Sequence, residues 1–236
     1  MQISDRLKLV AEFVSPCETV ADIGTDHGYV PIELIRQGKA KKVFAMDINK
    51  GPLERASRHI QEEGLSEQIE VRLSDGLDQL KPKEAQALVI AGMGGELIVR
   101  ILNNGKSVLD ETKELILSPH SEVFAVREYL VEEGFEIVRE DMIKDGGKYY
   151  IIMKAIHAKD PEKLKKEYSE RSYFVYGKKL IEEKNEILYE YLNWKKATFH
   201  KLYQSLERAV SDSALKRKEQ IHDELCVIDR TLGLME

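Results

Sequence analysis

The sequence predicts an α/β protein with a parallel, doubly wound sheet, followed by a helical C-terminal domain. Three observations predict this fold. Short apolar runs alternate with amphipathic segments over the first 158 residues, aspartate and glycine follow several of these runs, and the remaining residues combine high charge with helical spacing of apolar side chains. Strict alternation of buried strands and helices is typical of parallel sheets, because the connecting helices cover both faces of the sheet.

The strands are expected where an apolar run ends in polar or glycine residues. Two later runs are separated only by KDGG, which predicts an antiparallel hairpin at the end of the series. We expect parallel strands at 19–23, 42–47, 68–73, 85–91 and 114–118, helices at 31–37, 52–63, 96–103 and 123–133, and hairpin strands at 136–143 and 148–156.

The composition changes near residue 159, where we place the boundary between an N-terminal domain, 1–158, and a C-terminal domain, 159–236. From Lys159 onward the chain has 16 Lys and Arg against 15 Asp and Glu, whereas the whole chain has a net charge of −6. Asp160 and Pro161 supply an N-cap and a first-turn proline, which predicts that a new helix begins there.

The C-terminal domain is expected to form two long helices that fold back on each other in a coiled-coil-like hairpin. Its apolar residues follow three-, four- and seven-residue spacings. The turn falls in VSDSA, where Ser211 or Asp212 would cap the second helix. The spaced residues are Ile181, Leu188, Leu192, Phe199, Leu202, Leu206 and Val210, then Ile221, Leu225, Ile228 and Leu232.

The composition also argues against several classes of protein. A net charge of −6 disfavours a uniformly basic nucleic-acid binder. The sequence shows neither a charged-then-apolar leader nor an apolar run of about twenty residues, so we expect a cytoplasmic protein with no membrane partner. Cys17 and Cys226 lie far apart without a Cys-x-x-Cys pattern, which favours reduced thiols over a metal site.

The first predicted strand runs into DIGTDHGYVP, residues 22–31. Gly24 and Gly28 permit a sharp turn and the close approach of a ligand. Asp26 stands where a dinucleotide-binding G-x-G-x-x-G loop would have its second glycine. Its carboxylate would repel a phosphate but attract the cationic methionine moiety of S-adenosylmethionine. The alternative is a tight strand-to-helix turn that binds nothing.

The next three strand ends also carry residues suited to a nucleoside cofactor. Asp47 lies 25 residues after Asp22, where a carboxylate can accept hydrogen bonds from both ribose hydroxyls, although a surface cap is the alternative. The third strand ends in SDG, 74–76, which would meet the adenine edge unless Asp75 is only a helix cap. Three glycines within 92–95 leave room for a cofactor or base, or form a flexible loop with a packing methionine.

The stretches VADIGTDHGYVPIEL, AMDIN, SDGL, IAGMGGELI and DGGKYYIIMKA resemble the bacterial tRNA methyltransferases that modify N1 of adenine 22, and the strand series resembles the class I methyltransferase core. The resemblance covers the whole chain and implies S-adenosylmethionine as cofactor and tRNA as partner. The fifth strand ends in LSPHSE where we expect Gln-Pro-Asn, so the roles of Pro119 and His120 stay open. The implied cofactor site comprises Asp22, Gly24, Asp26, Gly28, Asp47, Ile48, Asp75, Gly76, Ala91, Gly92 and Met93.

The reaction implied by the resemblance needs positioning more than proton transfer. N1 of adenine has a lone pair in the ring plane and attacks a sulfonium methyl without first losing a proton. The methylated base becomes positive, so a nearby carboxylate would stabilise the developing charge. Asp26 is the first candidate for this catalytic role, with His27 or Tyr29 supporting or stacking. His27 is equally well a helix-start residue held by backbone contacts.

An adenine in a Watson–Crick pair must be exposed before reaction, so part of the protein must bind the surrounding RNA. Basic residues of the C-terminal domain are expected to contact phosphate, the alternative being a solvated helix face. Tyrosine and tryptophan there would stack on bases, although core packing is the default for most of them. The RNA-binding candidates are Lys178, Lys179, Lys195, Lys196, Lys201 and Arg208.

Two rival functions stay open on the sequence. One is a methyltransferase for a small metabolite or a protein, with the helical tail used for oligomerisation. The other is a nicotinamide-dependent oxidoreductase or a non-catalytic nucleotide-binding module, which the absence of G-x-G-x-x-G at the first turn disfavours. We expect a monomer or a weak dimer.

Overall fold

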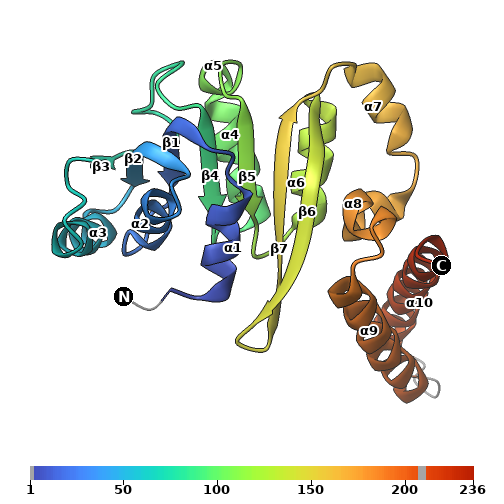
Figure 1. The fold of residues 1–236 in the computed structure, drawn as a ribbon. Helices are drawn as coiled ribbons and strands as arrows, with labels where there is room; N and C mark the ends of the chain where they lie inside the picture. Colours follow the sequence, from blue (N-terminus) through green and yellow to red (C-terminus); the bar gives the residue numbers. More distant parts are fainter. Residues whose placement is uncertain (1–2, 207–210) are drawn as a thin grey trace. The chain divides into compact units, whose positions relative to one another are not determined.

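A seven-stranded sheet with the order β3-β2-β1-β4-β5-β7-β6 forms the centre of the N-terminal part of the chain (Figure 1). Strands β1 to β5 are parallel, and β7 pairs antiparallel with both β5 and β6. This topology confirms the predicted doubly wound sheet and its closing hairpin, and every strand end lies within two residues of its predicted position. The strands are β1 (Cys17–Ile23), β2 (Ala40–Asp47), β3 (Ile69–Leu73), β4 (Ala87–Ala91), β5 (Glu114–Ser118), β6 (Phe135–Asp145) and β7 (Lys148–His157).

The computed structural model describes residues 3–206 and 211–236. The chain divides into two compact units, the first ending at Lys166 and the second beginning at Glu167. The division lies a few residues beyond the change in composition, because most of helix α7 (Pro161–Glu167) belongs to the first unit. The predicted cap of α7 is confirmed, since Oδ1 of Asp160 accepts a hydrogen bond from the backbone N–H of Lys163 at 3.0 Å.

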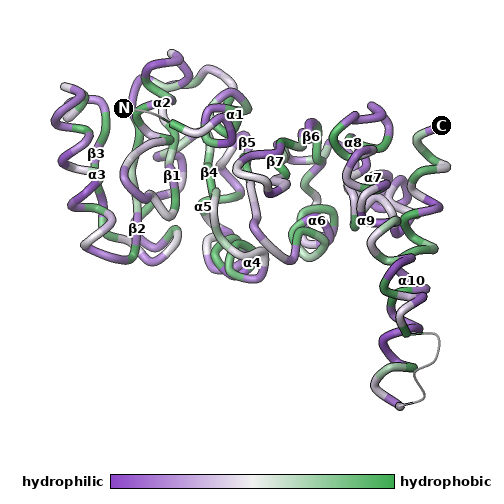
Figure 2. Tube along the Cα trace, turned by 90° about the horizontal axis from the view of Figure 1, so that it is seen from below, coloured by the Kyte–Doolittle hydropathy of each residue, from purple (hydrophilic) through white to green (hydrophobic). Residues whose placement is uncertain are grey.

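Each face of the sheet packs against its own group of helices. Val20 of β1 contributes to one apolar cluster with residues of α1, α2 and α3, whereas the next residue, Ala21, contributes to another with residues of α4, α5 and α6. Figure 2 shows α1 and α2 on one side of the strands and α4 and α6 on the other. The helices are α1 (Asp5–Phe13), α2 (Tyr29–Arg36), α3 (Lys50–Glu62), α4 (Gly95–Asn104), α5 (Lys106–Leu109) and α6 (Val123–Glu132).

Helix α1 was not among the predicted elements. Oγ of Ser4 accepts a hydrogen bond from the backbone N–H of Leu7 at 3.4 Å and caps the helix. Val10, Ala11 and Phe13 are buried against the sheet. A capping serine and apolar residues at helical spacing were therefore present in the sequence, and they fix the first turn of α1 relative to the strands.

The second unit is helical. It contains a π-helical turn, η1 (Tyr173–Gly177), and helices α8 (Lys178–Glu182), α9 (Glu186–Ser205) and α10 (Asp212–Leu234). Oγ of Ser211 accepts a hydrogen bond from the backbone N–H of Ala214 at 3.3 Å, which confirms the predicted cap of the second long helix. Val210 lies outside the described residues. The residues buried along the two long helices include Leu188, Leu192, Ile221, Leu225 and Ile228.

Candidate active site

A cavity of about 340 Å³ lies at the carboxyl ends of β1 and β4. These strands are the neighbours between which the strand order reverses, and ligands of doubly wound sheets bind at such a position. The volume lies in the range typical of small-molecule sites. The lining contains the predicted residues Asp22, Gly24, Asp26, Tyr29, Ala91 and Gly92, together with Arg6, Leu7, Val30 and His120.

The two glycines of the turn after β1 serve different purposes. Gly24 has a φ of +83°, and a Cβ atom there would lie 2.0 Å from Cε of Met93. Gly28 has a φ of +74° and precedes α2, where a Cβ atom would lie 3.3 Å from Cβ of Ala56 on α3. Gly24 therefore makes room for Met93 beside the cavity, whereas Gly28 allows α2 and α3 to pack closely.

Asp22 is a buried carboxylate at the inner end of the cavity lining, with a relative exposure of 5%. Burial raises the pKa of Asp22 to about 7; the hydrogen bond that the Thr25 hydroxyl donates to its carboxylate lowers the pKa, and the charge of Asp47 raises it. A cationic ligand would favour the ionised form of such a carboxylate, whereas an anionic ligand would oppose it. The turn is therefore suited to a positively charged group.

The three catalytic candidates lie together. Oδ1 of Asp26 accepts a hydrogen bond from Nη2 of Arg55 at 3.0 Å and lies 3.4 Å from Nε2 of His27. The His27 ring stacks on Tyr29 and His59, with centroid distances of 5.3 and 5.6 Å. Nδ1 of His59 lies 2.9 Å from the carbonyl oxygen of His27, which can only accept. Asp26 and Tyr29 line the cavity, whereas His27 is held in the turn by its neighbours.

The end of β2 lies next to the end of β3 at the same edge of the sheet. The carbonyl oxygen of Asp47 accepts a hydrogen bond from the backbone N–H of Ser74 at 2.9 Å. Oδ1 of Asp47 accepts one from the backbone N–H of Asn49 at 2.7 Å. The Ile48 side chain is 57% exposed. Asp75 is also exposed, and its carbonyl oxygen accepts from Asp78 in a turn rather than a helix. None of these residues lines the cavity.

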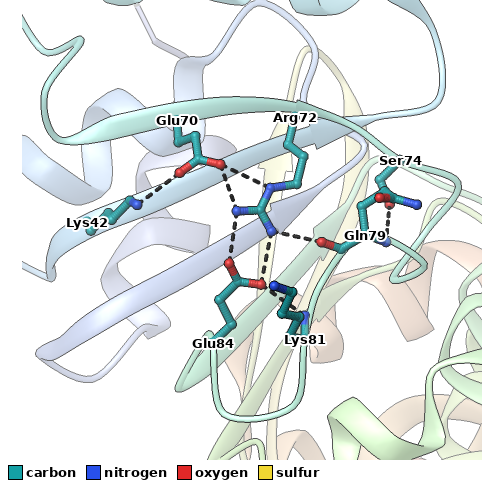
Figure 3. Close-up of polar contacts among 7 residues, drawn as sticks. All are labelled: Lys42, Glu70, Arg72, Ser74, Gln79, Lys81 and Glu84. Carbon is teal, nitrogen blue, oxygen red and sulfur yellow. Dashed lines mark hydrogen bonds and ion pairs between the residues drawn. The ribbon is translucent and has the colours of Figure 1, made fainter.

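Arg72 ties the loop that carries Asp75 and Gly76 to the edge of the sheet (Figure 3). Its guanidinium donates to Glu70 on the same strand at 2.7 Å, to Glu84 at 2.9 and 3.0 Å, and to the carbonyl oxygen of Gln79 at 2.8 Å. Bidentate bonds to a carboxylate fix a guanidinium in one plane. The sequence analysis did not predict this network, which holds the 74–84 loop at Gln79, near its middle, and at Glu84, at its end.

The glycine run after β4 lines part of the cavity and also allows neighbouring segments to pack closely. Gly92 has a φ of +85° and lines the cavity. A Cβ atom at Gly95 would lie 2.5 Å from the carbonyl oxygen of Glu122, so this glycine allows the start of α4 to approach the residue that precedes α6. Gly94 forms a bridge with Ser121 in the same region. The run is therefore tied to the neighbouring strand end rather than being a free loop.

Four cavity residues were missing from the predicted site, and two of them, Arg6 and His120, have polar side chains. The Arg6 guanidinium lies 4.9 Å from the ring centroid of Tyr150 on β7, and the His120 ring lies 5.4 Å from that of Tyr150. Burial, with the charges of Arg6 and Lys148, holds the pKa of His120 below its usual value. The departure of LSPHSE from the expected Gln-Pro-Asn was a sequence signal for His120. For Arg6 the signals were the Ser4 cap and the helical spacing of apolar residues, which indicate the helix that carries it.

The predicted RNA-binding lysines lie on α8 and α9, and most have carboxylate partners. Lys195 donates to Glu224 at 2.9 Å. Burial lowers the pKa of Lys195, but Tyr176 and Glu224 raise it more, so the pKa lies above its usual value. Lys201 is exposed, and no ion pair joins it to another residue of the described ranges. Of the other candidates, Lys178 pairs with Glu167 and Glu182, Lys179 with Glu182, and Lys196 with Asp229, while Arg208 lies outside the described residues.

Within residues 3–206 and 211–236, no cluster of three or more His, Cys, Asp or Glu side chains is arranged to hold a metal ion. Among the helices of these ranges, none combines the length and the apolar character that crossing a membrane requires.

The fold is that of a methyltransferase, and the family model described as "Methyltransferase domain" matches residues 3–153. The tRNA (adenine(22)-N(1))-methyltransferase of Bacillus subtilis strain 168 is 34% identical over 220 residues, which cover 92% of this chain and 91% of that protein. The chain belongs to the tRNA (adenine(22)-N(1))-methyltransferase family.

Solved structures agree with this family. The crystal structure of the B. subtilis m1A22 tRNA methyltransferase TrmK superposes with a TM-score of 0.85 at 30% identity, covering 100% of this chain and 99% of that one. Streptococcus pneumoniae Sp1610, in complex with S-adenosyl-L-methionine, superposes with a TM-score of 0.81 at 31% identity, covering 98% of this chain and 100% of that one. The similarity extends over both units of the chain.

Proposed function

We propose that this protein uses S-adenosylmethionine to methylate N1 of adenine 22 in the D-arm region of tRNA. The observation that carries the proposal is the similarity to the B. subtilis enzyme along almost the full length of both chains. A methyltransferase for a small metabolite or a protein is not favoured, because the B. subtilis relative that matches the helical unit as well as the sheet is a tRNA methyltransferase.

The carboxyl edge of the sheet fits S-adenosylmethionine. The buried carboxylate of Asp22, with its pKa of about 7, suits a cationic ligand, and the turn at Gly24 gives close access to backbone. In this proposal the methionine end occupies the cavity, Asp47 accepts from the ribose hydroxyls, and the adenine lies by Asp75. The cofactor-binding set is Asp22, Gly24, Asp26, Gly28, Asp47, Ile48, Asp75, Gly76, Ala91, Gly92 and Met93.

The chemistry requires alignment and charge stabilisation. When bound, S-adenosylmethionine supplies a methyl group on a positive sulfur; adenine N1 bonds to the methyl carbon with its lone pair, and the carbon–sulfur electron pair stays on the sulfur. The base becomes positive and releases no proton. Asp26 stabilises that charge, and the 3.0 Å hydrogen bond from Arg55 holds its carboxylate in place. Tyr29 supports the base from the cavity wall, with His27 stacked behind it.

We assign tRNA binding to residues 159–236, with α9 and α10 packed as a coiled-coil-like hairpin. The exposed charge of Lys201 is available to phosphate, whereas Lys178, Lys179, Lys195 and Lys196 would exchange a carboxylate partner for a phosphate. Arg208 belongs to the same proposed set. Since the substrate is tRNA, we place the enzyme in the cytoplasm, as a monomer or a weak dimer.

The proposal is tested by comparing possible methyl acceptors. The full chain is titrated with S-adenosylmethionine and with NAD, and is then incubated with labelled methyl donor and either unmodified tRNA, a tRNA-free extract of small metabolites, or total protein. We expect binding of S-adenosylmethionine alone and label in tRNA alone. Label in the metabolite or protein fraction would overturn the substrate assignment, and binding of NAD alone would overturn the reaction class.

A further inference from the structure

A second cavity, of about 330 Å³, lies within the helical unit. Its lining comes from α9, from α10 and from the segment just before η1. On α10 the lining residues Arg217, Gln220, Ile221 and Glu224 follow three-, four- and seven-residue steps, so they share one face of the helix. Helices α9 and α10 lie side by side (Figure 1), and Phe199 of α9 lines the cavity. The volume lies at the lower end of the range typical of small-molecule sites.

The cavity contains an aromatic ring that the protein does not bury fully. Phe199 is partly exposed, whereas Ile221, the other large apolar residue of the lining, is buried. Nζ of Lys195 lies 5.3 Å from the centroid of the Phe199 ring, so a cation is placed near the ring. Accessible aromatic rings with nearby cations are the surfaces on which nucleic-acid-binding proteins stack single bases.

Two guanidinium groups of the lining have no carboxylate partner within the described residues. Neither Arg171 nor Arg217 forms an ion pair there, and the hydrogen bond that Arg217 donates goes to a neutral glutamine amide at 3.2 Å. The carboxylate of Glu224 is paired with Lys195 at 2.9 Å, which leaves Asp223 as the other acidic side chain of the lining. The cavity therefore presents two positive groups against one negative group, and it favours an anion.

A nucleotide has the groups that match this lining. Its base has flat apolar faces that stack on a phenylalanine ring, and its phosphate accepts paired hydrogen bonds from guanidinium groups. An amino group on the base can donate to Asp223, which only accepts when ionised. An acidic peptide would satisfy the arginines but would place its carboxylates beside Asp223 and leave Phe199 without a flat partner. A cavity of this volume accommodates a single nucleotide rather than a base pair, so the nucleotide must be unpaired.

We propose that this cavity binds one unpaired nucleotide of the substrate tRNA, with the base on Phe199 and the phosphate at Arg171 and Arg217. The inference rests on the proposed function, because it takes tRNA as the substrate. The RNA-binding candidates predicted from the sequence do not include these three residues. The cavity adds a contact with a base to the phosphate contacts already proposed for the helical unit.

The test compares the binding of the full-length protein to unmodified tRNA and to a blunt-ended RNA duplex at several salt concentrations. The variants are Arg171→Gln, Arg217→Gln and Phe199→Leu. Lys216→Gln is the control of equal charge change, because Lys216 precedes Arg217 on α10, is exposed and lies outside the lining. Circular dichroism confirms that each variant is folded.

We expect Arg171→Gln and Arg217→Gln each to weaken tRNA binding a few-fold and to reduce the slope of log affinity against log salt by about 1. Phe199→Leu should weaken tRNA binding by about fivefold or more without changing the slope, because stacking releases no counterion. Phe199→Leu should bind the duplex as the wild type does, since paired bases cannot enter the cavity. Lys216→Gln should change the affinity for tRNA by about twofold or less.

Folded Arg217→Gln and Phe199→Leu variants that bind tRNA as tightly as the wild type would overturn the proposal and leave the cavity to another partner, such as an acidic peptide. Equal losses in Lys216→Gln and Arg217→Gln, or an equal loss on the duplex in Phe199→Leu, would overturn it as well. In these cases a wild type that methylates tRNA would keep the proposed function. A wild type that shows the expected pattern but leaves tRNA unmethylated would overturn the proposed function alone, and the nucleotide site would stand. A wild type that binds no tRNA would overturn both.

Discussion

The carboxyl edge of the sheet and the helical second unit are both rich in charged side chains, but they use them differently. At the sheet edge, Asp22 is buried with a raised pKa and Nη1 of Arg6 has no partner within the described residues. In the second unit, Lys195 and Lys196 are paired with carboxylates of α10. Buried polar groups with a shifted pKa or without a hydrogen-bond partner indicate a ligand site, and the sheet edge contains both kinds.

The paired lysines of the second unit are still available to RNA. The partly exposed ion pair between Lys196 and Asp229 contributes about 0 to 1 kcal/mol, so a phosphate can replace this carboxylate at small cost, whereas the Lys195 side chain is mostly buried. Phosphate contacts with several lysines would add favourable counterion release. Under the proposed function the two regions differ in preorganisation: the proposed cofactor site exists before its ligand arrives, whereas the proposed RNA contacts of the paired lysines would form by exchange of ion-pair partners.

Removal of the second unit has the largest expected effect. A chain that ends at Lys166 should bind S-adenosylmethionine within about twofold of the full-length affinity, because every proposed cofactor contact precedes the cut. Its methylation of tRNA should fall by about a hundredfold or more, since the proposed phosphate contacts are gone. Calorimetry and a methylation assay measure the two effects. A folded, shortened chain that methylates tRNA at the full-length rate would show that the helices serve stability or oligomerisation.

Substitution of Asp47 tests the adenosine half of the sheet edge. Asp47→Ala removes the acceptor for two ribose hydroxyls, and each hydrogen bond to a charged group contributes about 1.5 to 3 kcal/mol. The affinity for S-adenosylmethionine should fall by about a hundredfold or more by calorimetry. Asp110→Ala, an exposed aspartate after α5, is the matched control. If folded Asp47→Ala binds S-adenosylmethionine as tightly as the wild type, Asp47 does not accept hydrogen bonds from the ribose hydroxyls.

Asp26→Asn separates catalysis from binding. Asparagine keeps an oxygen that can accept from Arg55 but lacks the negative charge. We expect the single-turnover rate, with saturating cofactor and tRNA, to fall by about tenfold, and the affinity for tRNA to change little. If the rate matches that of the wild type, Asp26 only shapes the turn.

The pH dependence of stability tests the burial of Asp22. Between about pH 4 and pH 7, folded wild type keeps a proton on Asp22 that the unfolded chain has released, so its stability falls as the pH rises through this window. Asp22→Asn cannot titrate there and should gain about 3 to 4 kcal/mol relative to the wild type as the pH rises through this window, since the pKa is raised from 3.8 to about 7 and one pKa unit corresponds to about 1.4 kcal/mol. Urea unfolding at a series of pH values measures the difference. A difference that stays constant over the window would show that the carboxylate is ionised and well solvated.

The smallest effect is expected from single lysines of the second unit. Lys201 is exposed, so Lys201→Glu should weaken tRNA binding a few-fold and reduce the slope of log affinity against log salt by about 1. Lys195→Glu places a second carboxylate beside Glu224 and should lower the thermal stability more than Lys201→Glu does. Equal salt slopes for Lys201→Glu and the wild type would exclude Lys201 from the phosphate contacts.

The sequence was sufficient to predict the sheet because buried strands leave a local signal. The fifth strand, Glu114–Ser118, coincides with its predicted range, since a short apolar run closed by polar residues has few other interpretations. The positions of Asp22, Asp26 and Gly92 around one cavity followed from topology, because parallel strands place their carboxyl ends at one edge.

The remaining features depend on contacts between distant segments. Arg6 and His120 meet at Tyr150 only because α1, β5 and β7 pack together, and no local pattern encodes that meeting. The partners of Lys195 and Lys196 lie on the other long helix, so helical spacing alone could not separate a paired lysine from an exposed one. The roles of Asp47, Asp75 and the lysines stay predictions.

The position of the methyl group on tRNA tests the central claim most directly. Unmodified tRNA transcripts with adenine or guanine at position 22 are incubated with the full-length protein and isotopically labelled S-adenosylmethionine, and nuclease fragments are analysed by mass spectrometry. The account predicts one labelled methyl group, on N1 of adenine 22, and none on the transcript with guanine there. Label at another nucleotide, equal labelling of both transcripts, or no label in tRNA from a protein that binds S-adenosylmethionine would contradict it.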